Sequence, residues 1–519
     1  MEGYGGLGRA TMQDQQQPQP LSGAPMWLAG FGLALANFVV ILDTTITNVS
    51  VPHIAGGLAV SPAQGTWTIT SYAVAEAITV PLSGWLSARF GTLRTLVWAL
   101  LGFGLFSVLC GLSRTIEMLV VLRVLQGFCG GPMMPMTQTL MLRVFPPDKM
   151  GLANGLWGVT AISAPILGPL AGGMIVDNLD WPWIFFINLP VVGVCYLTVT
   201  GLLGKFETPT RMERIDITGM VLLVLFAGSL QLVLDLGREH DWFASGLIVT
   251  LAVVSAVAFA VFIAWELTDS HPVVDLRVLR HRSLAVGLPV LAIGFGSMMA
   301  MLVLIPLWLQ SVVGYTASSA GQLMAMQGVF AVLLSPVAAV LIQKVDMRWP
   351  ITAGLVITLA TAIMRMGWTG DADFWTFAMP QLIQGVGMPF FFIGVMTMAL
   401  VGVPQRDIAM AAGLLNFLRT VAGAAGTALS TSAWDNATRA TRGELVGTLN
   451  GVDQMTAQMA GGREIGLAVV ERLVEEQAAT IGSAHVFGLA IVAIAVTTAL
   501  VWLMPRTVAQ GTAGIPAAH

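Results

Sequence analysis

Four ionisable residues lie inside long apolar stretches of the chain, where a charge is costly. They are Asp43, Glu76, Arg123 and Arg419. A carboxyl group buried in hydrocarbon can take up and release a proton, and a buried guanidinium can hold a carboxylate or attract an acidic ligand. These residue types therefore indicate proton exchange and recognition of charge.

Asp43 and Arg123 are expected to lie at similar depth in a membrane. Each is displaced from the middle of its apolar run toward the outer side, by about 6 Å for Asp43 and about 10 Å for Arg123 at 1.5 Å per residue. The Arg favours a charged carboxylate and burial favours a neutral one, so the pair is suited to proton exchange at Asp43. A static ion pair that joins two helices is the alternative.

Glu76 lies at the centre of an apolar run without Lys or Arg. It is either a second proton site or a protonated, hydrogen-bonded spectator. Arg419 lies at the centre of a later run, with Asn416 one helical turn away, and no acidic residue shares its depth in that half of the chain. We expect Arg419, Asn416 and Gln384 to attract acidic lipophiles, with a purely structural role for Arg419 as the alternative.

The composition requires a membrane. The 519 residues are 56% hydrophobic and only 10% charged, whereas soluble proteins carry about 25% charged residues. This balance excludes a soluble enzyme, and a net charge of −4 gives no reason to expect a nucleic-acid partner. The three cysteines, Cys110, Cys129 and Cys195, lie in apolar runs without metal-ligand spacing. We expect no metal, no cofactor, no phosphate-binding loop and no catalytic triad.

Fourteen apolar runs are long enough to span a bilayer as helices, which predicts an all-α membrane protein. They lie near residues 26–52, 66–87, 93–112, 116–143, 150–176, 183–204, 217–236, 244–266, 284–312, 318–343, 350–369, 375–402, 408–434 and 483–504. With both termini in the cytoplasm, fifteen Lys and Arg residues fall in cytoplasmic segments and two in short outer loops. This asymmetry predicts a multi-pass protein with cytoplasmic termini.

Two parts of the sequence resemble each other. Gln126-Gly127 and Gln384-Gly385 lie 258 residues apart, and the run after each is rich in small residues. This predicts two six-helix halves, 25–204 and 283–505, joined by a segment with two extra helices, 205–282. Repeated halves are typical of transporters that bind substrate between them near the midplane.

Two further features concern the lining of a cavity and the shape of the fifth span. Met133, Met134 and Met136, together with Phe390 to Phe392, are candidates for an adaptable cavity lining. The fifth span carries a cluster that is expected to bend it and to allow close helix packing: Pro165, Gly168, Pro169, Gly172 and Gly173.

The polar segments lie outside the predicted spans. Residues 435–481 form a polar outer loop with helical periodicity near 465–479, either solvated or a docking surface. Residues 1–24, which contain a possible alternative start at Met12, are expected to be a disordered tail, and residues 506–519 form a C-terminal tail. The first has no signal-peptide features.

The motifs resemble those of the major facilitator superfamily, specifically its fourteen-span drug/proton antiporters. Four stretches resemble motifs of this family: Leu42 to Val49, Leu119 to Gly127, Ala164 to Gly173, and Trp183 to Pro190. Further stretches, such as Leu234 to Phe243, are similar to EmrB-type inner-membrane subunits of tripartite efflux pumps. Two features depart from the family pattern: Ala88 stands where the superfamily usually has Asp, and Glu76 is not part of a family motif.

The resemblance implies a function. It implies multidrug efflux from the bacterial inner membrane, driven by the proton motive force, and hence antibiotic resistance. It also implies a periplasmic adaptor and an outer-membrane channel as partners. The alternatives are a single-component facilitator or an exporter of one lipophilic metabolite or fatty acid, and a sensor that binds a lipophile without moving it.

Overall fold

The computed structural model describes residues 19–146, 149–210, 216–238, 240–269, 272–404, 407–448 and 463–506. Within these ranges the chain is helical and contains no strand, which confirms the all-α prediction. The proposed start at Met12, most of the predicted tails and the tip of the predicted outer loop, 449–462, lie outside the described residues.

The N-terminal half consists of α1 to α8. Their bounds are α1 Gly23–Gly57, α2 Pro62–Thr79, α3 Ser83–Phe90, α4 Thr92–Gly111, α5 Ile116–Val144, α6 Met150–Asn178, α7 Trp183–Phe186 and α8 Asn188–Leu202. A capping box at Ser61 and Gln64 begins α2, because each side chain bonds the other residue's backbone N–H. The second predicted span is divided, with α2 followed by α3 after a break that contains Pro81.

Two extra helices precede the C-terminal half. The linking helices are α9 Ile217–Leu236 and α10 Gly246–Thr268. The C-terminal half comprises α11 Arg282–Ser311, α12 Ala317–Lys344, α13 Arg348–Arg365, α14 Phe374–Ala399, α15 Ile408–Thr448 and α17 Arg463–Val501. Short 3-10 turns occur at Gly204–Phe206, Trp242–Ala244 and Leu276–Arg280.

The spans number fourteen when broken helices are joined. Eleven spans of the described part are long and apolar enough to cross a membrane, one of them formed by α7 and α8 together, and the bent α6 makes a twelfth. The remaining two predicted spans correspond to α2 with α3 and to α13, which are less apolar because they carry buried polar groups such as Glu76 and Arg365.

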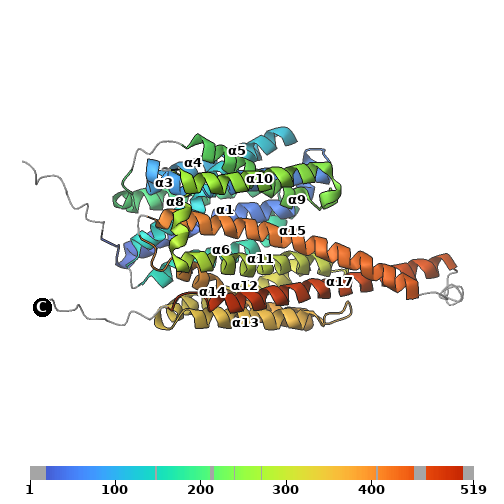
Figure 1. The fold of residues 1–519 in the computed structure, drawn as a ribbon. Coiled ribbons are helices and arrows are strands. Elements are labelled where there is room, and N and C mark those ends of the chain that lie inside the picture. Colours follow the sequence, from blue (N-terminus) through green and yellow to red (C-terminus); the bar gives the residue numbers. More distant parts are fainter. Residues whose placement is uncertain are drawn as a thin grey trace, which may run out of the picture.

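The two halves repeat the same packing. The α5 and α14 helices begin 258 residues apart, at Ile116 and Phe374, and so do α6 and α15, at Met150 and Ile408. In the N-terminal half α6 packs on α1, and in the C-terminal half α15 packs on α11. The linking helix α9 packs on α2 and α15, where Phe226 contacts Phe417 with ring centroids 6.1 Å apart, and α10 packs on α9. Figure 1 shows these helices running side by side through one bundle.

The bundle has two distinct ends. Both described ends of the chain, near Leu21 and Met504, lie at the end that we call the termini end; the Leu21 N–H bonds the carbonyl of Val144 at the last turn of α5. At the opposite hairpin end, α15 and α17 project beyond the other helices (Figure 1). Residues 435–448 and 463–481 are thus continuous with the membrane helices: the helical periodicity predicted near 465–479 is present in α17, and residues 435–448 extend α15.

Candidate functional site

A cavity of about 520 Å³ lies between the two halves. Its lining is mostly apolar and comes from helices of both halves: Thr44, Thr45 and Asn48 of α1, Pro165 and Pro169 of α6, Phe295 and Met299 of α11, Met324 of α12, and Thr420, Gly423 and Thr427 of α15. A concave, largely apolar site with a few polar groups is the usual form of a small-molecule pocket. The cavity lies between the two repeated halves, as transporters with repeated halves usually have it.

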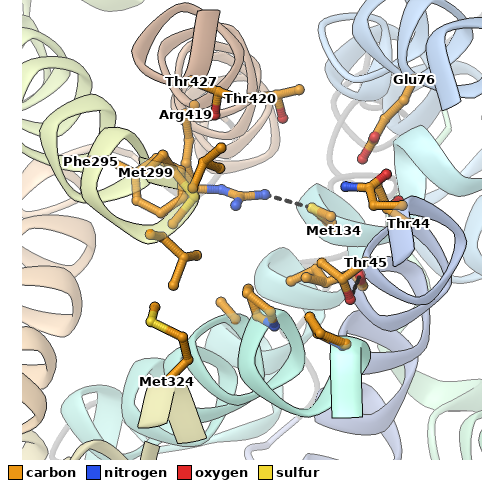
Figure 2. Close-up of a pocket in the computed structure, with 18 of the residues that line it drawn as sticks. Thr44, Thr45, Glu76, Met134, Phe295, Met299, Met324, Arg419, Thr420 and Thr427 are labelled. Atoms are coloured by element: carbon orange, nitrogen blue, oxygen red, sulfur yellow. Dashed lines mark hydrogen bonds between the residues drawn. The ribbon is translucent and has the colours of Figure 1, made fainter. Parts of the chain in front are cut away.

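Two charged residues face this cavity, Glu76 from α2 and Arg419 from α15 (Figure 2). The Arg419 Nη2 lies 2.8 Å from the sulfur of Met134, and its guanidinium lies 5.4 Å from the centre of the Phe295 ring. Among the described residues, neither the Arg419 Nε nor the Glu76 carboxylate has a hydrogen-bond partner in the protein. The cavity therefore offers one acid and one cation to a ligand.

The cavity is closed at the termini end by direct contact between the halves. The rings of Trp157 and Phe392 stack with centroids 6.2 Å apart, and Gly155 packs so closely on Ala339 that a Cβ there would lie 2.6 Å from the alanine Cβ. The lining residues on α11, from Phe295 to Pro306, run from the middle of that helix toward the hairpin end.

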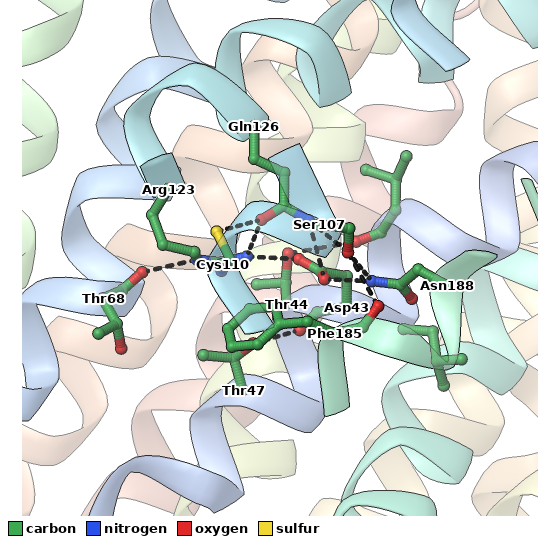
Figure 3. Close-up of polar contacts among 12 residues, drawn as sticks. Asp43, Thr44, Thr47, Thr68, Ser107, Cys110, Arg123, Gln126, Phe185 and Asn188 are labelled. Carbon is green, nitrogen blue, oxygen red and sulfur yellow. Dashed lines mark hydrogen bonds and ion pairs between the residues drawn. The ribbon is translucent and has the colours of Figure 1, made fainter. Parts of the chain in front are cut away.

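Asp43 and Arg123 form a sealed ion pair away from this cavity. The Arg123 Nη1 lies 2.6 Å from the Asp43 Oδ2, and both side chains are fully buried. The contact predicted from their depths is present. The other carboxylate oxygen accepts hydrogen bonds from the amide nitrogens of Asn188, at 2.6 Å, and Gln126, at 3.1 Å (Figure 3).

The ion pair belongs to a wider polar cluster. Arg123 also donates through Nε to the carbonyl of Thr68, at 2.9 Å, and stacks 4.3 Å from the centre of the Tyr72 ring. Asn188 and Gln126 both donate to the hydroxyl of Ser107, at 2.9 and 3.3 Å. The Asp43 cluster (Asp43, Ser107, Arg123, Gln126 and Asn188) therefore joins α1, α4, α5 and α8, with α2 bound through Thr68.

Three members of this cluster were not predicted as site residues. Gln126 and Asn188 lie in motifs that were noted for other reasons, and Ser107 is an ordinary small residue of an apolar helix. The sequence carries a signal for Gln126 alone, because its carboxamide precedes Gly127 of the internal repeat. A rule that every buried charge needs several hydrogen-bond partners would have led to Gln126.

Seven residues predicted for the cavity do not line it: Met133, Met136, Gln384, Phe390, Phe391, Phe392 and Asn416. Met133 and Met136 are fully buried in the hydrophobic core, and Met134 faces the cavity instead. Successive residues on a helix point about 100° apart, so three neighbouring methionines cannot share one wall. Asn416 donates to Gln138 across the halves at 3.0 Å, and Gln384 binds the buried guanidinium of Arg365.

The α6 motif serves two purposes. Its segments on either side of Ile166 are bent by 43°, as expected where prolines remove backbone donors. Gly168 and Gly172 allow α6 to approach α1, because a Cβ on Gly168 would overlap the Thr45 hydroxyl and one on Gly172 would lie 3.2 Å from the Ile46 carbonyl. No atom of another element lies within 4 Å of a Cβ built at Gly173, so close packing does not explain that glycine.

The comparisons with known proteins agree with this architecture. A Major Facilitator Superfamily model matches residues 33–427. The multidrug export protein EmrB of Escherichia coli is 43% identical over 424 residues, which cover 81% of this chain and 82% of that protein. The fatty acid resistance protein FarB of Neisseria gonorrhoeae is 38% identical over 492 residues, 93% of this chain and 97% of that protein.

A solved structure shares the fold at low identity. The human organic anion transporter MFSD10 superposes with a TM-score of 0.55 and 13% identity, covering 91% of this chain and all of that chain. At that identity the likeness concerns the fold alone.

Proposed function

The chain belongs to the Major Facilitator Superfamily and, within it, to the EmrB-type transporters, and on this premise we propose that it exports lipophilic compounds in exchange for protons. The observation that carries the proposal is the cavity between the halves, with an apolar lining and only Glu76 and Arg419 as charged groups. Apolar walls suit hydrophobic drugs of varied shape, and one acid among them suits an exchange of substrate for proton.

We assign the exchangeable proton to Glu76. Its carboxyl group faces the cavity, so a substrate and a proton compete for the same space and charge. Asp43 has three donors on its carboxylate, and protonating it would disrupt bonds to Arg123 or to the two amides. In this proposal the Asp43 cluster holds five helices together as one body while the halves move.

Location and partners extend the proposal. The orientation is the one predicted from the basic residues, with the termini end in the cytoplasm and the cavity nearer the periplasmic face of the inner membrane. The projecting part of α15 and α17 then reaches into the periplasm, which supports a periplasmic adaptor as its partner and, through it, an outer-membrane channel. Lipophilic substrates, protons and membrane lipid are the other partners, and no cofactor is required beyond the proton motive force.

Purified protein in proteoliposomes tests the proposal. A lipophilic dye added to vesicles under an imposed pH gradient should move only when the gradient is present, and its movement should release protons. Dye movement that is independent of the gradient would contradict the antiporter and favour the facilitator. Truncating α15 and α17 beyond the membrane should leave this vesicle transport intact but abolish resistance in cells if a tripartite pump is the working unit.

The second candidate is an exporter dedicated to one acidic amphiphile such as a fatty acid. Arg419 in the cavity favours it, and the relative FarB is named for fatty acid resistance. Competition between a fatty acid and a cationic dye for transport separates the two, because a dedicated exporter would not move the dye.

A further inference from the structure

A second buried guanidinium, Arg365 at the end of α13, has no carboxylate partner. Its side chain is 1% exposed, and none of the ion pairs formed by the described residues includes it. It donates to the side-chain oxygens of Gln384 and, at 3.0 Å, Gln381, while its Nε has no partner among the described residues. An unneutralised buried charge is costly, so Arg365 is a candidate to bind an anionic group.

The internal repeat relates the surroundings of Arg365 to the Asp43 cluster. An offset of 258 residues relates Gln126 to Gln384, Arg123 to Gln381, and Ser107 to Arg365. The same offset relates Asp43 to Met301, whose sulfur lies 3.5 Å from the Arg365 Nη1. The C-terminal half therefore has polar or thioether side chains at four of the five positions of the Asp43 cluster, whereas the equivalent of Asn188 is the exposed Val446. Its cation has moved to the neighbouring helix, and a methionine replaces the carboxylate.

This second cluster lies directly behind the wall of the cavity. The amide nitrogen of Gln381 contacts the sulfur of Met324 at 3.6 Å, and Met324 lines the cavity near its hairpin end. Met301 is flanked on α11 by the lining residues Met299, Leu302 and Val303. Methionine side chains are unbranched and change rotamer easily, so two thioethers make a movable partition between the cavity and the cation.

A further buried donor near the cluster also has no acceptor. The indole nitrogen of Trp308 has no hydrogen-bond partner among the described residues. The rings of Trp308 and Trp368 stack with centroids 5.6 Å apart. Trp368 also lies 5.9 Å from the guanidinium of Arg365. Two buried donors without a partner thus lie near the same aromatic ring, and a buried polar group of this kind favours binding of an acceptor.

We propose that Arg365 forms a second binding site, for the carboxylate of an acidic amphiphile whose apolar part occupies the cavity. The carboxylate reaches it when Met324 and Met301 turn aside, and it takes the place that Asp43 holds in the other half. The proposal rests on the proposed function in that lipophiles occupy the cavity. Because the site lies toward the hairpin end, it adds to Arg419 an anion position along the exit route.

The repeat supplies the test. Met301→Asp places a carboxylate at the position where the N-terminal half has Asp43, so this carboxylate pairs with the Arg365 guanidinium in place of a ligand. Met301→Asn is the matched neutral control. Arg365→Gln removes the cation and serves as an independent variant if one of the others folds poorly. Equilibrium binding of a fluorescent fatty acid and of its methyl ester to each purified variant needs no proton gradient, so failed proton coupling would not affect the result.

We expect Met301→Asp and Arg365→Gln each to weaken binding of the acid by about tenfold or more, as for loss of a charge-assisted hydrogen bond, and to leave binding of the ester within about twofold. Met301→Asn should bind both probes as the wild type does. Equal weakening of acid and ester, or normal binding of the acid in either charge variant, would overturn the proposal and leave Arg365 a structural residue.

Discussion

The Asp43 cluster and the cavity contain the same pair of ionisable types, one carboxyl and one guanidinium, yet they differ in every other respect. Asp43 accepts three hydrogen bonds, one of them from Arg123, in a fully buried site. Glu76 has no hydrogen-bond partner among the described residues and faces about 520 Å³ of open space opposite Arg419. The first arrangement holds helices together, and the second leaves its charges available to a ligand and a proton.

The difference shows that burial alone does not identify a proton carrier. Both carboxyl groups are more than nine-tenths buried. What separates them is the number of donors that a proton would have to displace, because each bond to the charged form opposes protonation. A buried acid with a complete set of donors is a structural element, and one that faces a cavity without donors is the better candidate for exchange.

The largest effect should come from breaking the sealed pair. Arg123→Met leaves Asp43 buried without its cation and should lower the free energy of unfolding by about 3–5 kcal/mol. Denaturant unfolding in micelles measures this loss. The double variant Asp43→Asn with Arg123→Met removes both charges and should be more stable than Arg123→Met alone. A double variant that is less stable than the single one would refute the role assigned to the pair.

A smaller effect, confined to selectivity, is expected on the cavity side. Arg419→Gln should leave stability nearly unchanged but shift the ratio of transported acidic to cationic substrates about tenfold toward the cations, as expected for a lost charged hydrogen bond. Competitive uptake in inverted vesicles measures the ratio. Arg419→Lys keeps the charge and is the control. An unchanged ratio in Arg419→Gln would mean that the cavity cation does not read substrate charge.

The smallest effect should separate neighbouring methionines. Met134→Leu replaces the thioether beside Arg419 and should change the apparent affinity for a lipophilic dye by about two- to threefold, whereas Met133→Leu keeps core volume and should not change it. Dye binding followed by fluorescence measures both. Equal effects of the two substitutions would show that the cavity surface is not the one described.

Much of this architecture follows from the sequence. Apolar runs and loop charges are sufficient for the helices, and depth alone brings Asp43 to Arg123. Helix rotation is not available from one sequence, because the partner that buries a face can come from the other half. For that reason Met134 rather than Met133 faces the cavity, and Asn416 contacts Gln138 instead of a substrate.

The prediction for residues 435–481 also gave too much weight to their polarity. The charged residues after position 435 suggested a loop, but helical periodicity continued and no proline interrupts 435–448 or 463–481, so the membrane helices extend unbroken. The Arg365 cluster was missed because its partners are neutral amides and thioethers, which carry no charge pattern to search for.

The central claim is that Glu76, and not Asp43, exchanges the proton. The most direct measurement is dye-driven proton release in proteoliposomes containing equal amounts of wild type, Glu76→Gln or Asp43→Asn. We expect Glu76→Gln to abolish coupled proton release in a normally folded protein, and Asp43→Asn to keep the ratio of protons to dye at a lower rate. Full coupling in Glu76→Gln, together with its loss in folded Asp43→Asn, would contradict the account.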